Sequence, residues 1–492
     1  MSPASASPAA PRAVLAAAIL ASSLGFIDGS VLPVAIPAIR VDLGADFTQV
    51  QWLSNGYMLL LSALILVGGA AGDLFGQRET YAGGILVFCL ASVGCALAGS
   101  AGDLLAWRAA QGAGAAFMVP GSLALIARTF PSATRGRAIG LWSMASGVAA
   151  ALGPILGGYL IDAGGPPAWR WIFWINLPVG LATLALLYGW TPRLPARAGG
   201  RLDLVGAALV TVGLGGLALG LTYASEPAPP IARIAACFAL GVLALAVFWV
   251  WEGQVPSPML PRQLFRLRVF NGANLLTFFL YFALAGTLFF LPITLIEALG
   301  LPEAQAGSVF LPFTVAMALM SRYAGGLSDR IGPRLPLTLG SAVTGLSFLA
   351  LAAAIGARAF LPGVVPAMVL MGIGMGLVVT PLSTTVMTAA DDALAGTASG
   401  VNNGVARIAG LFAVAGLGVV ASLAYRLDID PALVSGGYGE PLALQSEAAR
   451  LMRADALIAA FIAVSGVTAV LSFVSAAISW ALLPGKQGQP QK

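Results

Sequence analysis

Residues 69–78 have the sequence Gly-Ala-Ala-Gly-Asp-Leu-Phe-Gly-Gln-Arg, and residues 325–334 have the sequence Gly-Gly-Leu-Ser-Asp-Arg-Ile-Gly-Pro-Arg. Both stretches place a glycine four residues before an aspartate, a second glycine three residues after it and an arginine five residues after it. Each stretch separates two long apolar runs. Repeats of this kind build secondary transporters, in which two halves move about a central site. The repeat therefore predicts a chain made of two related halves.

The rest of the chain is almost entirely apolar. Of its 492 residues, 59% are hydrophobic and 9% are charged, against roughly 25% charged residues in an ordinary soluble domain. The mean hydropathy is +0.91. So few charges cannot solvate the surface of a globular protein of this size, which excludes a soluble enzyme. The composition predicts an all-α integral membrane protein.

The apolar runs define the domain organisation. A membrane-spanning helix needs about 20 mostly apolar residues. This criterion predicts about fourteen transmembrane helices, at residues 14–37, 51–72, 81–99, 104–127, 138–162, 172–190, 203–223, 231–251, 270–296, 304–326, 336–356, 361–388, 397–424 and 455–483. We therefore expect two six-helix repeat bundles plus two inserted helices, divided into a cytoplasmic tail 1–13, an N-terminal bundle 14–190, a linker with two additional helices 191–269, a C-terminal bundle 270–484 and a cytoplasmic tail 485–492.

The basic residues predict the orientation, because Lys and Arg collect in cytoplasmic loops. With the N-terminus inside, the inner segments hold Arg12, Arg78, Arg128, Arg135, Arg137, Arg193, Arg197, Arg201, Arg262, Arg266, Arg268, Arg322, Arg330, Arg334, Lys486 and Lys492. The outer loops hold only Arg40, Arg170, Arg233, Arg358, Arg426, Arg450 and Arg453. We expect a multi-pass protein of the cell membrane, a bacterial plasma or inner membrane, with both termini cytoplasmic.

Several kinds of chemistry are absent from the sequence. It has no histidine, and its three cysteines, Cys89, Cys95 and Cys237, lie inside apolar runs. Ser-His and Cys-His catalysis and His-ligated metals are therefore excluded, and no phosphate-binding loop motif occurs. The basic residues are scattered, which argues against nucleic acid as a partner. We expect no enzyme, no metal and no cofactor, and partners limited to small-molecule substrates, protons and membrane lipid.

Two charged residues fall deep inside predicted membrane helices. A charge at the centre of a membrane helix costs about 2.5 to 3.5 kcal/mol, so it should be functional and should have a partner. At 1.5 Å per residue, Asp28 lies about 9 Å and Arg108 about 8 Å below the same outer edge of the membrane core. The two depths match, and each of the two charges is expected to have a partner.

Arg407 is a third candidate for an intramembrane polar residue, with Asn402 and Asn403 about one turn before it. Its depth depends on where its helix begins. We expect a position at the cytoplasmic interface, and a deeper position is the alternative.

The motifs together resemble the major facilitator superfamily, in the branch of fourteen-span drug:proton antiporters. The loop motif between spans 2 and 3 is matched by Gly69, Asp73, Gly76 and Arg78, and the span-4 motif by Arg108, Gln111, Gly112 and Gly114. The antiporter motif of span 5 is matched by Gly147, Gly153, Pro154, Gly157 and Gly158, and the run before span 6 by Trp169, Arg170, Asn176 and Pro178. In span 1 the pattern is matched by Asp28 and Ser30, but Pro33 stands where the family has asparagine. The resemblance covers nearly the whole chain.

The resemblance implies roles for these residues. In this fold spans 1 and 4 line the cavity of the first half, which makes direct or water-bridged contact between Asp28 and Arg108 plausible as a proton-coupling pair. Gating is implied for the two loop repeats and for span 5, that is, for Gly69, Asp73, Gly76, Arg78, Asp329, Gly332, Arg334, Gly147, Gly153, Pro154, Gly157 and Gly158. Substrate-cavity candidates are Phe26, Ser30, Trp52, Tyr57, Gln111, Asn274, Phe278 and Tyr281.

Each motif also has a purely structural interpretation. Asp73 and Asp329 would be solvated charges at the membrane surface, and the small residues of span 5 would only allow close helix packing. The cavity aromatics, taken singly, would be packing residues or interfacial anchors. For span 5 both interpretations hold together, because Gly153-Pro154 bends the helix while its neighbours pack tightly.

These features predict a proton-coupled secondary transporter that exports small lipophilic compounds by alternating access. The second half offers no deep carboxylate, since Asp391 and Asp392 are the only acids between residues 336 and 427. We therefore expect neutral or monocationic substrates and discrimination against dications. The alternatives are an exporter dedicated to one metabolite or antibiotic, or a proton-coupled importer. A membrane sensor or enzyme fits poorly.

The orientation predicts the outcome of a reporter experiment. A reporter fused after Lys492 and one inserted near Arg197 should both report the cytoplasm, while one near Gly436 should report the exterior, because the arginines retain the intervening loops inside. Paired phosphatase and fluorescent-protein fusions would measure this. An external C-terminus would contradict the fourteen-span topology.

Overall fold

The computed structural model describes residues 10–191, 202–226, 228–255, 258–391, 394–430, 434, 437–438 and 446–485. Within these residues fourteen helices are long and apolar enough to cross a membrane, which confirms the predicted all-α fold with fourteen spans. The largest difference is in the last span, which starts at Glu447 instead of residue 455 because Ser446 caps it through the Ala449 amide. Arg193, Arg197, Arg201, Gly436, Lys486 and Lys492, most of the two predicted tails and part of the predicted linker lie outside the described residues.

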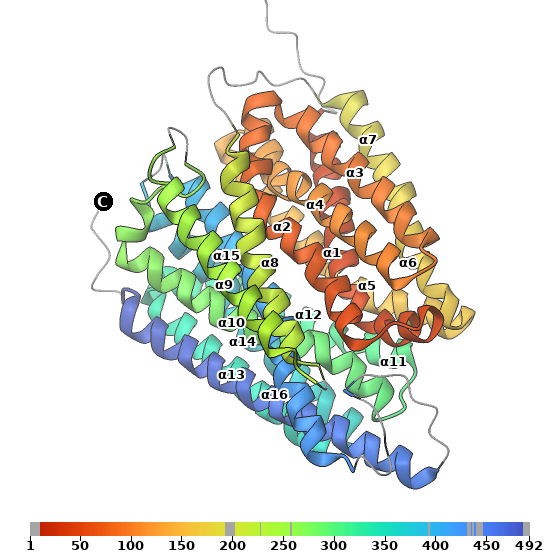
Figure 1. Ribbon diagram of the computed structural model, residues 1–492. Helices are drawn as coiled ribbons and strands as arrows, with labels where there is room; N and C mark the ends of the chain where they lie inside the picture. Colours follow the sequence, from red (N-terminus) through yellow and green to blue (C-terminus); the bar gives the residue numbers. More distant parts are fainter. Residues whose placement is uncertain are drawn as a thin grey trace, which may run out of the picture.

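The helices form three groups along the chain (Figure 1). The N-terminal half contains α1 (Ala10–Leu43), α2 (Phe47–Phe75), α3 (Gln77–Leu97), α4 (Ala101–Thr129), α5 (Ser132–Gly164), and a sixth span made of a 3-10 turn (Pro166–Trp169), α6 (Arg170–Trp174) and α7 (Asn176–Trp190). The inserted pair is α8 (Leu204–Ala224) and α9 (Ile231–Trp251). The C-terminal half contains α10 (Arg268–Glu297), α11 (Glu303–Ser308), α12 (Phe310–Ile331), α13 (Arg334–Gly356), α14 (Val365–Thr388), α15 (Ala395–Asp428) and α16 (Glu447–Leu482).

The sequence repeat is also a repeat of backbone geometry. Gly76 and Gly332, the glycines that follow the two motif aspartates, have φ angles of 100° and 84°. Side chains other than glycine rarely adopt this left-handed region. Each glycine ends one membrane helix, α2 or α12, and lets the chain turn at once into the next. The motif thus makes the same tight corner in both halves.

Helix packing repeats as well. A Cβ atom at Gly84 of α3 would lie 2.9 Å from the Gly114 carbonyl oxygen of α4, and a Cβ at Gly340 of α13 would lie 2.7 Å from the Gly374 carbonyl oxygen of α14. In membranes, where water does not drive helices together, small residues allow the close backbone contacts that hold helices. Equivalent glycine pairs therefore fix the third and fourth spans of each half.

Polar contacts join the two halves at one end of the bundle, which we call the Arg40 end; the opposite end, with the loop repeats, is the Asp73 end. Arg40 of α1 donates to the Glu297 carboxylate of α10 at 2.5 Å, and Arg453 of α16 donates to the other Glu297 oxygen at 2.8 Å. Asp162 at the end of α5 accepts the amides of Glu303 and Ala304 at the start of α11, at 3.1 and 3.0 Å. These bonds close the Arg40 end of the structure.

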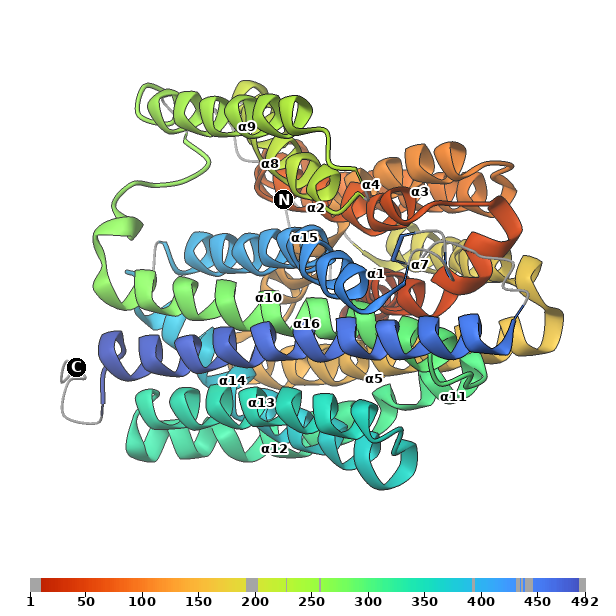
Figure 2. The same ribbon diagram turned by 60° about the horizontal axis from the view of Figure 1, so that its bottom comes forward.

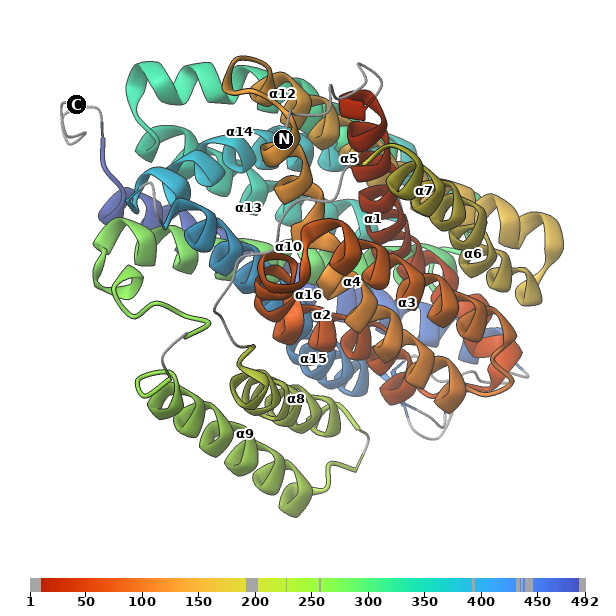
Figure 3. The ribbon, with the colours of Figure 1, turned by 90° about the horizontal axis from the view of Figure 1, so that it is seen from above.

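The inserted pair covers one seam between the halves. α8 packs against α2 and α15, and α9 packs on α8 as the outermost helix (Figures 2 and 3). Leu214 and Ala218 of α8 share an apolar cluster with Leu411 of α15. At the Arg40 end the Ser225 hydroxyl lies 3.2 Å from the Gln51 side-chain oxygen of α2, and the Ser225 carbonyl accepts the Ser422 hydroxyl of α15 at 2.5 Å. The insertion therefore touches both halves.

The glycine contact in α3 predicts a contrast between adjacent positions. Gly84→Ala should lower the melting temperature of the detergent-solubilised protein, because overpacking costs about 1 to 3 kcal/mol. Gly83→Ala is the matched control, since a Cβ there meets nothing within 4 Å and alanine favours the helix. Equal melting temperatures for the two variants would contradict the close contact of α3 with α4.

Candidate functional site

Asp28 and Arg108 form a buried ion pair in the N-terminal half. Asp28 lies on α1 and Arg108 on α4, and the Arg108 Nη1 and Asp28 Oδ2 atoms are 2.5 Å apart. Each residue is 1% exposed. The matching depths expected from the sequence therefore correspond to a direct contact.

Gln111 completes the site. It lies three residues after Arg108, so both side chains leave the same face of α4. Its amide nitrogen donates to Asp28 Oδ1 at 2.9 Å, and its oxygen accepts Arg108 Nη1 at 2.6 Å. Both carboxylate oxygens of Asp28 are thus hydrogen-bonded, one by each neighbour. A buried charge pair is tolerable when its polar atoms are satisfied in this way.

A second layer of polar groups holds these three side chains. The Gln111 nitrogen also donates to the Ser92 hydroxyl of α3 at 2.8 Å, and the Asn176 amide at the start of α7 reaches the same hydroxyl at 3.2 Å. Arg108 Nε donates to the Leu53 carbonyl of α2 at 3.1 Å. Sequence reasoning missed Ser92 and Leu53, because a single serine or a main-chain carbonyl inside an apolar helix gives no signal. Asn176 was visible only as part of a motif.

Tyr57 closes the site from the side of α2. The Arg108 guanidinium carbon lies 4.5 Å from the centre of the Tyr57 ring and 5.8 Å from that of Phe173. Such cation–π contacts stabilise a desolvated arginine. The guanidinium of the ion pair therefore contacts two aromatic rings, one from α2 and one from α6.

The predicted substrate-cavity residues differ in burial and in hydrogen-bond partners. Gln111 is fully buried in the ion-pair network, and Ser30 donates to the Ile27 carbonyl beside Gly153. Asn274 is 9% exposed and accepts the Asn402 amide at 3.1 Å. The remaining residues, Phe26, Trp52, Phe278 and Tyr281, are half-buried, and Tyr57 is buried. Their roles as substrate contacts stay predictions.

In the loop repeat, Asp73 and Arg78 bind different partners. Arg128 at the end of α4 donates to Asp73 Oδ1 at 2.6 Å, and both side chains are partly exposed. Arg78 is buried and donates to the Thr191 carbonyl that follows α7 at 2.9 Å, with its guanidinium 5.1 Å from the Tyr188 ring centre. The motif therefore fastens the ends of four helices, α2, α3, α4 and α7, at the Asp73 end.

The C-terminal copy reproduces the arginine contact. Arg334 Nε donates to the Leu483 carbonyl after α16 at 2.8 Å, and its guanidinium lies 5.7 Å from the Trp480 ring centre. In both halves the motif arginine thus binds the carboxyl end of the last helix, where a cation is favourable. Asp329 is exposed and has no ion pair among the described residues. The two copies differ in their aspartates.

The glycines of α5 face two different helices. A Cβ at Gly153 or Gly157 would meet Ser30 or Val31 of α1, and a Cβ at Gly158 would lie 2.4 Å from the Glu303 carbonyl of α11. A Cβ at Gly307 of α11 would in turn lie 2.2 Å from the Pro154 carbonyl. A Cβ at Gly147 meets nothing within 4 Å. This part of α5 joins the halves closely near the Arg40 end.

Arg407 lies twelve residues after Ala395, about 18 Å along α15. On the same helix, Gly404 faces Ile65 of α2 and Gly410 faces Ala285 of α10. Arg407 therefore lies on the stretch of α15 that faces both halves, which favours the deeper of the two positions considered for it. The sequence did not decide between these positions, because the neighbours of a helix do not follow from its length.

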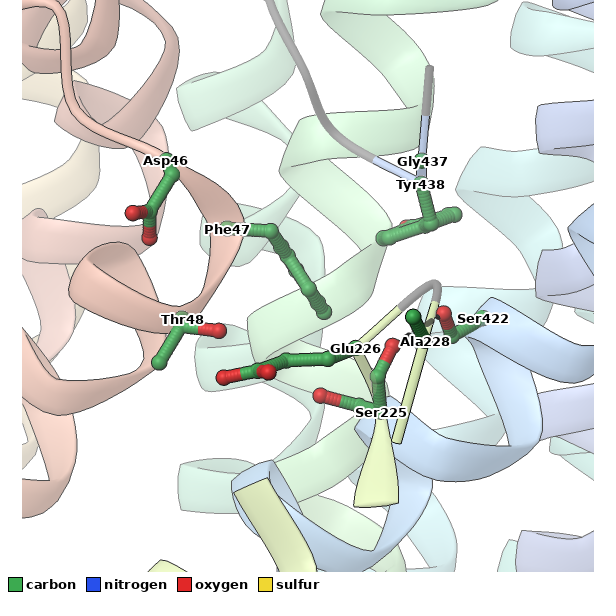
Figure 4. Close-up of a pocket in the computed structure, with 9 residues that line it drawn as sticks. All are labelled: Asp46, Phe47, Thr48, Ser225, Glu226, Ala228, Ser422, Gly437 and Tyr438. Carbon is green, nitrogen blue, oxygen red and sulfur yellow. Dashed lines mark hydrogen bonds between the residues drawn. The ribbon is translucent and has the colours of Figure 1, made fainter. Parts of the chain in front are cut away.

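One polar pocket lies at the Arg40 end, away from the ion pair. It has a volume of about 450 Å³ and is lined by Asp46, Phe47, Thr48, Ser225, Glu226, Ala228, Ser422, Gly437 and Tyr438 (Figure 4). Asp46 uses its carboxylate to cap α2 through the Gln49 amide. None of the predicted site residues lines this pocket.

The fold and the site define a secondary transporter: two related halves of six membrane helices, with a satisfied ion pair buried in one of them. The chain belongs to the Major Facilitator Superfamily, whose sequence profile matches residues 18–414. This confirms the superfamily that the motifs resemble, and the chain is a multi-pass membrane protein.

Similar proteins include exporters. The chain is 35% identical to the cephamycin export protein CmcT of Amycolatopsis lactamdurans, over 81% of this chain and 83% of that protein. It is 32% identical to the tetracenomycin C resistance and export protein of Streptomyces glaucescens, over 80% of this chain and 73% of that protein. The fold is similar to an inward-facing bacterial homolog of the human lysosomal transporter Spinster, with 18% identity, a TM-score of 0.67 and coverage of 96% and 97%.

Proposed function

We propose that this protein is a proton-coupled exporter of small lipophilic compounds that works by alternating access, in the fourteen-span drug:proton antiporter branch of its superfamily. The observation that carries the proposal is the buried network of Asp28, Arg108 and Gln111. A titratable carboxylate held at membrane depth is expensive and marks an ion or proton pathway. The names of the similar proteins, which are resistance and export proteins, support the direction of transport.

Asp28 is the proton carrier in this proposal, and Arg108 sets the balance between the protonated and the charged form of its carboxyl group. Burial of a carboxyl group favours its neutral form, whereas a neighbouring arginine favours the carboxylate. When a proton binds, the charge attraction between Asp28 and Arg108 is lost, and Arg108 keeps its bond to the Leu53 carbonyl. A proton at Asp28 thus weakens the link between α1 and α4. Such a local change can bias the arrangement of helices.

Both termini are cytoplasmic in this proposal, in the cell membrane of a bacterium. The Asp73 end then faces the cytoplasm, and the closed Arg40 end faces outward. The structure is accordingly assigned to an inward-facing state. The rocking units are residues 14–190 and 270–484, with 191–269 as the linker that carries two additional helices and short tails at 1–13 and 485–492.

The loop repeats and α5 act as gates in this proposal. The pair of Asp73 with Arg128 and the contact of Arg78 with Thr191 hold helix ends within one half, so they can be exchanged for contacts with the other half when the cytoplasmic side closes. The close contact of α5 with α11 seals the outer side.

An exporter dedicated to one metabolite is the second candidate function, since CmcT is named as a cephamycin export protein.

Coupling is tested by Asp28→Asn. This variant keeps the shape of Asp28 and imitates the protonated state, so we expect it to reach the membrane, to lose uphill export and to lose the pH dependence of drug binding. Arg108→Ala should also change that pH dependence, because it removes the cation that contacts the Asp28 carboxylate. Drug efflux from cells measures uphill export, and binding to purified protein from pH 5 to 9 measures the pH dependence.

Asp103→Asn is the matched control, because Asp103 is an exposed acid in the first turn of α4. It should export normally. If Asp28→Asn still exports drug against its gradient, and stops when an uncoupler collapses the proton gradient, the coupling residue lies elsewhere.

Gating is tested by Asp73→Asn. Loss of the Asp73–Arg128 pair should slow the exchange between inward-open and outward-open states, while equilibrium drug binding changes little because the pair lies at the membrane surface. Single-molecule fluorescence measures the exchange, and a binding titration on the same sample measures affinity. Equal losses of binding and transport would point to misfolding or a direct substrate contact.

A further inference from the structure

Arg407 is a deep cation that the proposed coupling mechanism does not use. Several other buried or half-buried arginines have acidic partners, as Arg108 has Asp28, Arg170 has Asp42, and Arg40 and Arg453 share Glu297, while Arg334 and Arg426 bind main-chain carbonyls. Arg407 is half-buried and has neither an ion pair nor a hydrogen bond to any residue that the structure describes. An arginine inside a membrane protein normally has a partner. Its partner should therefore come from outside the chain.

The helical positions around Arg407 show where its side chain points. On the same helix, Gly404 faces Ile65 of α2, and Gly410 faces Ala285 of α10. At 100° per residue, Arg407 lies between these two faces, so it projects between α2 and α10. Its effect on Tyr57 of α2 and Tyr281 of α10 agrees with this direction. The guanidinium therefore faces the space between the two halves.

Two asparagines precede Arg407 on α15, on its side toward the Asp73 end. Asn403, one turn before Arg407, is exposed, and its side chain donates to the Ser399 carbonyl. Asn402 points to another side, where its amide donates to Thr277 Oγ1 at 2.7 Å and to Asn274 Oδ1 at 3.1 Å. Asn402 thus holds α15 to α10, while Asn403, which shares the side of Arg407, is exposed.

Aromatic side chains accompany this cation. Tyr281 and Phe278 are three residues apart on α10 and half-buried, and the Phe278 ring centre lies 6.2 Å from that of Phe282. Apolar and aromatic walls with a few oriented polar groups are typical of small-molecule sites. Arginine offers five N–H donors in a planar fork that suits two oxygens of an acidic group. A ligand that is both aromatic and acidic therefore matches these side chains.

From this arrangement we infer that Arg407 is a specificity-determining residue that binds the anionic oxygen group of a lipophilic aromatic substrate. The inference rests on the proposed export function and specifies the substrate class. It changes the expectation from the sequence, which was for neutral or monocationic compounds: neutral substrates remain, and acidic ones take the place of monocations. Discrimination against dications follows from the same positive charge.

The Tyr57 ring links this site to the proton site. It is stacked on Arg108 and lies within the electrostatic reach of Arg407. An acidic substrate at Arg407 therefore binds on the side of Tyr57, whose ring contacts Arg108 of the ion pair. Substrate and proton can then influence each other without direct contact, and the influence must be reciprocal.

A matched pair of dyes tests the inference. 1-Anilinonaphthalene-8-sulfonate and N-phenyl-1-naphthylamine share one ring system, and only the first carries an anionic group. Both are titrated by fluorescence into purified protein in nanodiscs, with empty nanodiscs subtracted. In Arg407→Gln we expect the affinity for the sulfonate dye to fall about tenfold or more, as for loss of a charge-assisted hydrogen bond, while the affinity for the neutral dye changes less than twofold. Arg407→Lys should give an intermediate loss.

Arg330→Gln is the matched control, since Arg330 is an exposed arginine at the end of α12 and its removal changes the net charge equally. It should leave both dyes unaffected. Equal binding of the sulfonate dye by the native protein and Arg407→Gln, or equal losses for both dyes, would overturn the inference. Proton-driven export of the neutral dye by Arg407→Gln cells is measured in parallel. Its persistence leaves the proposed function standing whichever way the binding result falls.

Discussion

A charge inside the membrane core has to be neutralised and hydrogen-bonded, and the ion pair of Asp28 with Arg108 shows what this requires. Its partners come from α1, α2, α3, α4 and α7: Gln111 shares the face of Arg108, Ser92 and Asn176 hold Gln111, and Leu53 supplies a carbonyl. A displacement of any of these helices would leave a buried polar atom without a partner, which costs about 1 to 3 kcal/mol. The pair therefore fixes the packing of the N-terminal half.

Glycine makes this packing possible. Gly112 of α4 approaches the Tyr57 carbonyl so closely that a Cβ would lie 2.2 Å away, and Tyr57 is the residue that stacks on Arg108. The short distance between the α2 and α4 backbones is what brings that ring onto the guanidinium. Packing by small residues and burial of the ion pair are thus two aspects of one arrangement. The C-terminal half has an equivalent contact, since a Cβ at Gly372 of α14 would lie 2.3 Å from the Phe313 carbonyl of α12, but no corresponding ion pair occurs among its described residues.

Much of this could be predicted from the sequence. Apolar runs located the fourteen spans because the bilayer sets helix length, and matching depths together with the family resemblance pointed to contact between Asp28 and Arg108. Position around the helix axis could not be obtained in this way. The sequence did not show that Gln111 hydrogen-bonds both Asp28 and Arg108, or that Arg407 faces α2 and α10. Both points concern which neighbour a helix face meets, and that depends on tertiary packing.

The hydrogen bonds of Ser225 and Glu226 attach the inserted pair to the two halves unequally. The Ser225 carbonyl and that of Glu226 accept three hydrogen bonds from Ser422 and Arg426 of α15. Only the Ser225 hydroxyl reaches Gln51 of α2, at 3.2 Å, and the same hydroxyl also donates to the Thr222 carbonyl at 2.7 Å. The carboxyl end of α8 is therefore hydrogen-bonded more firmly to α15 than to α2. Any separation of α2 from α15 has to break fewer hydrogen bonds of the inserted pair on the side of α2.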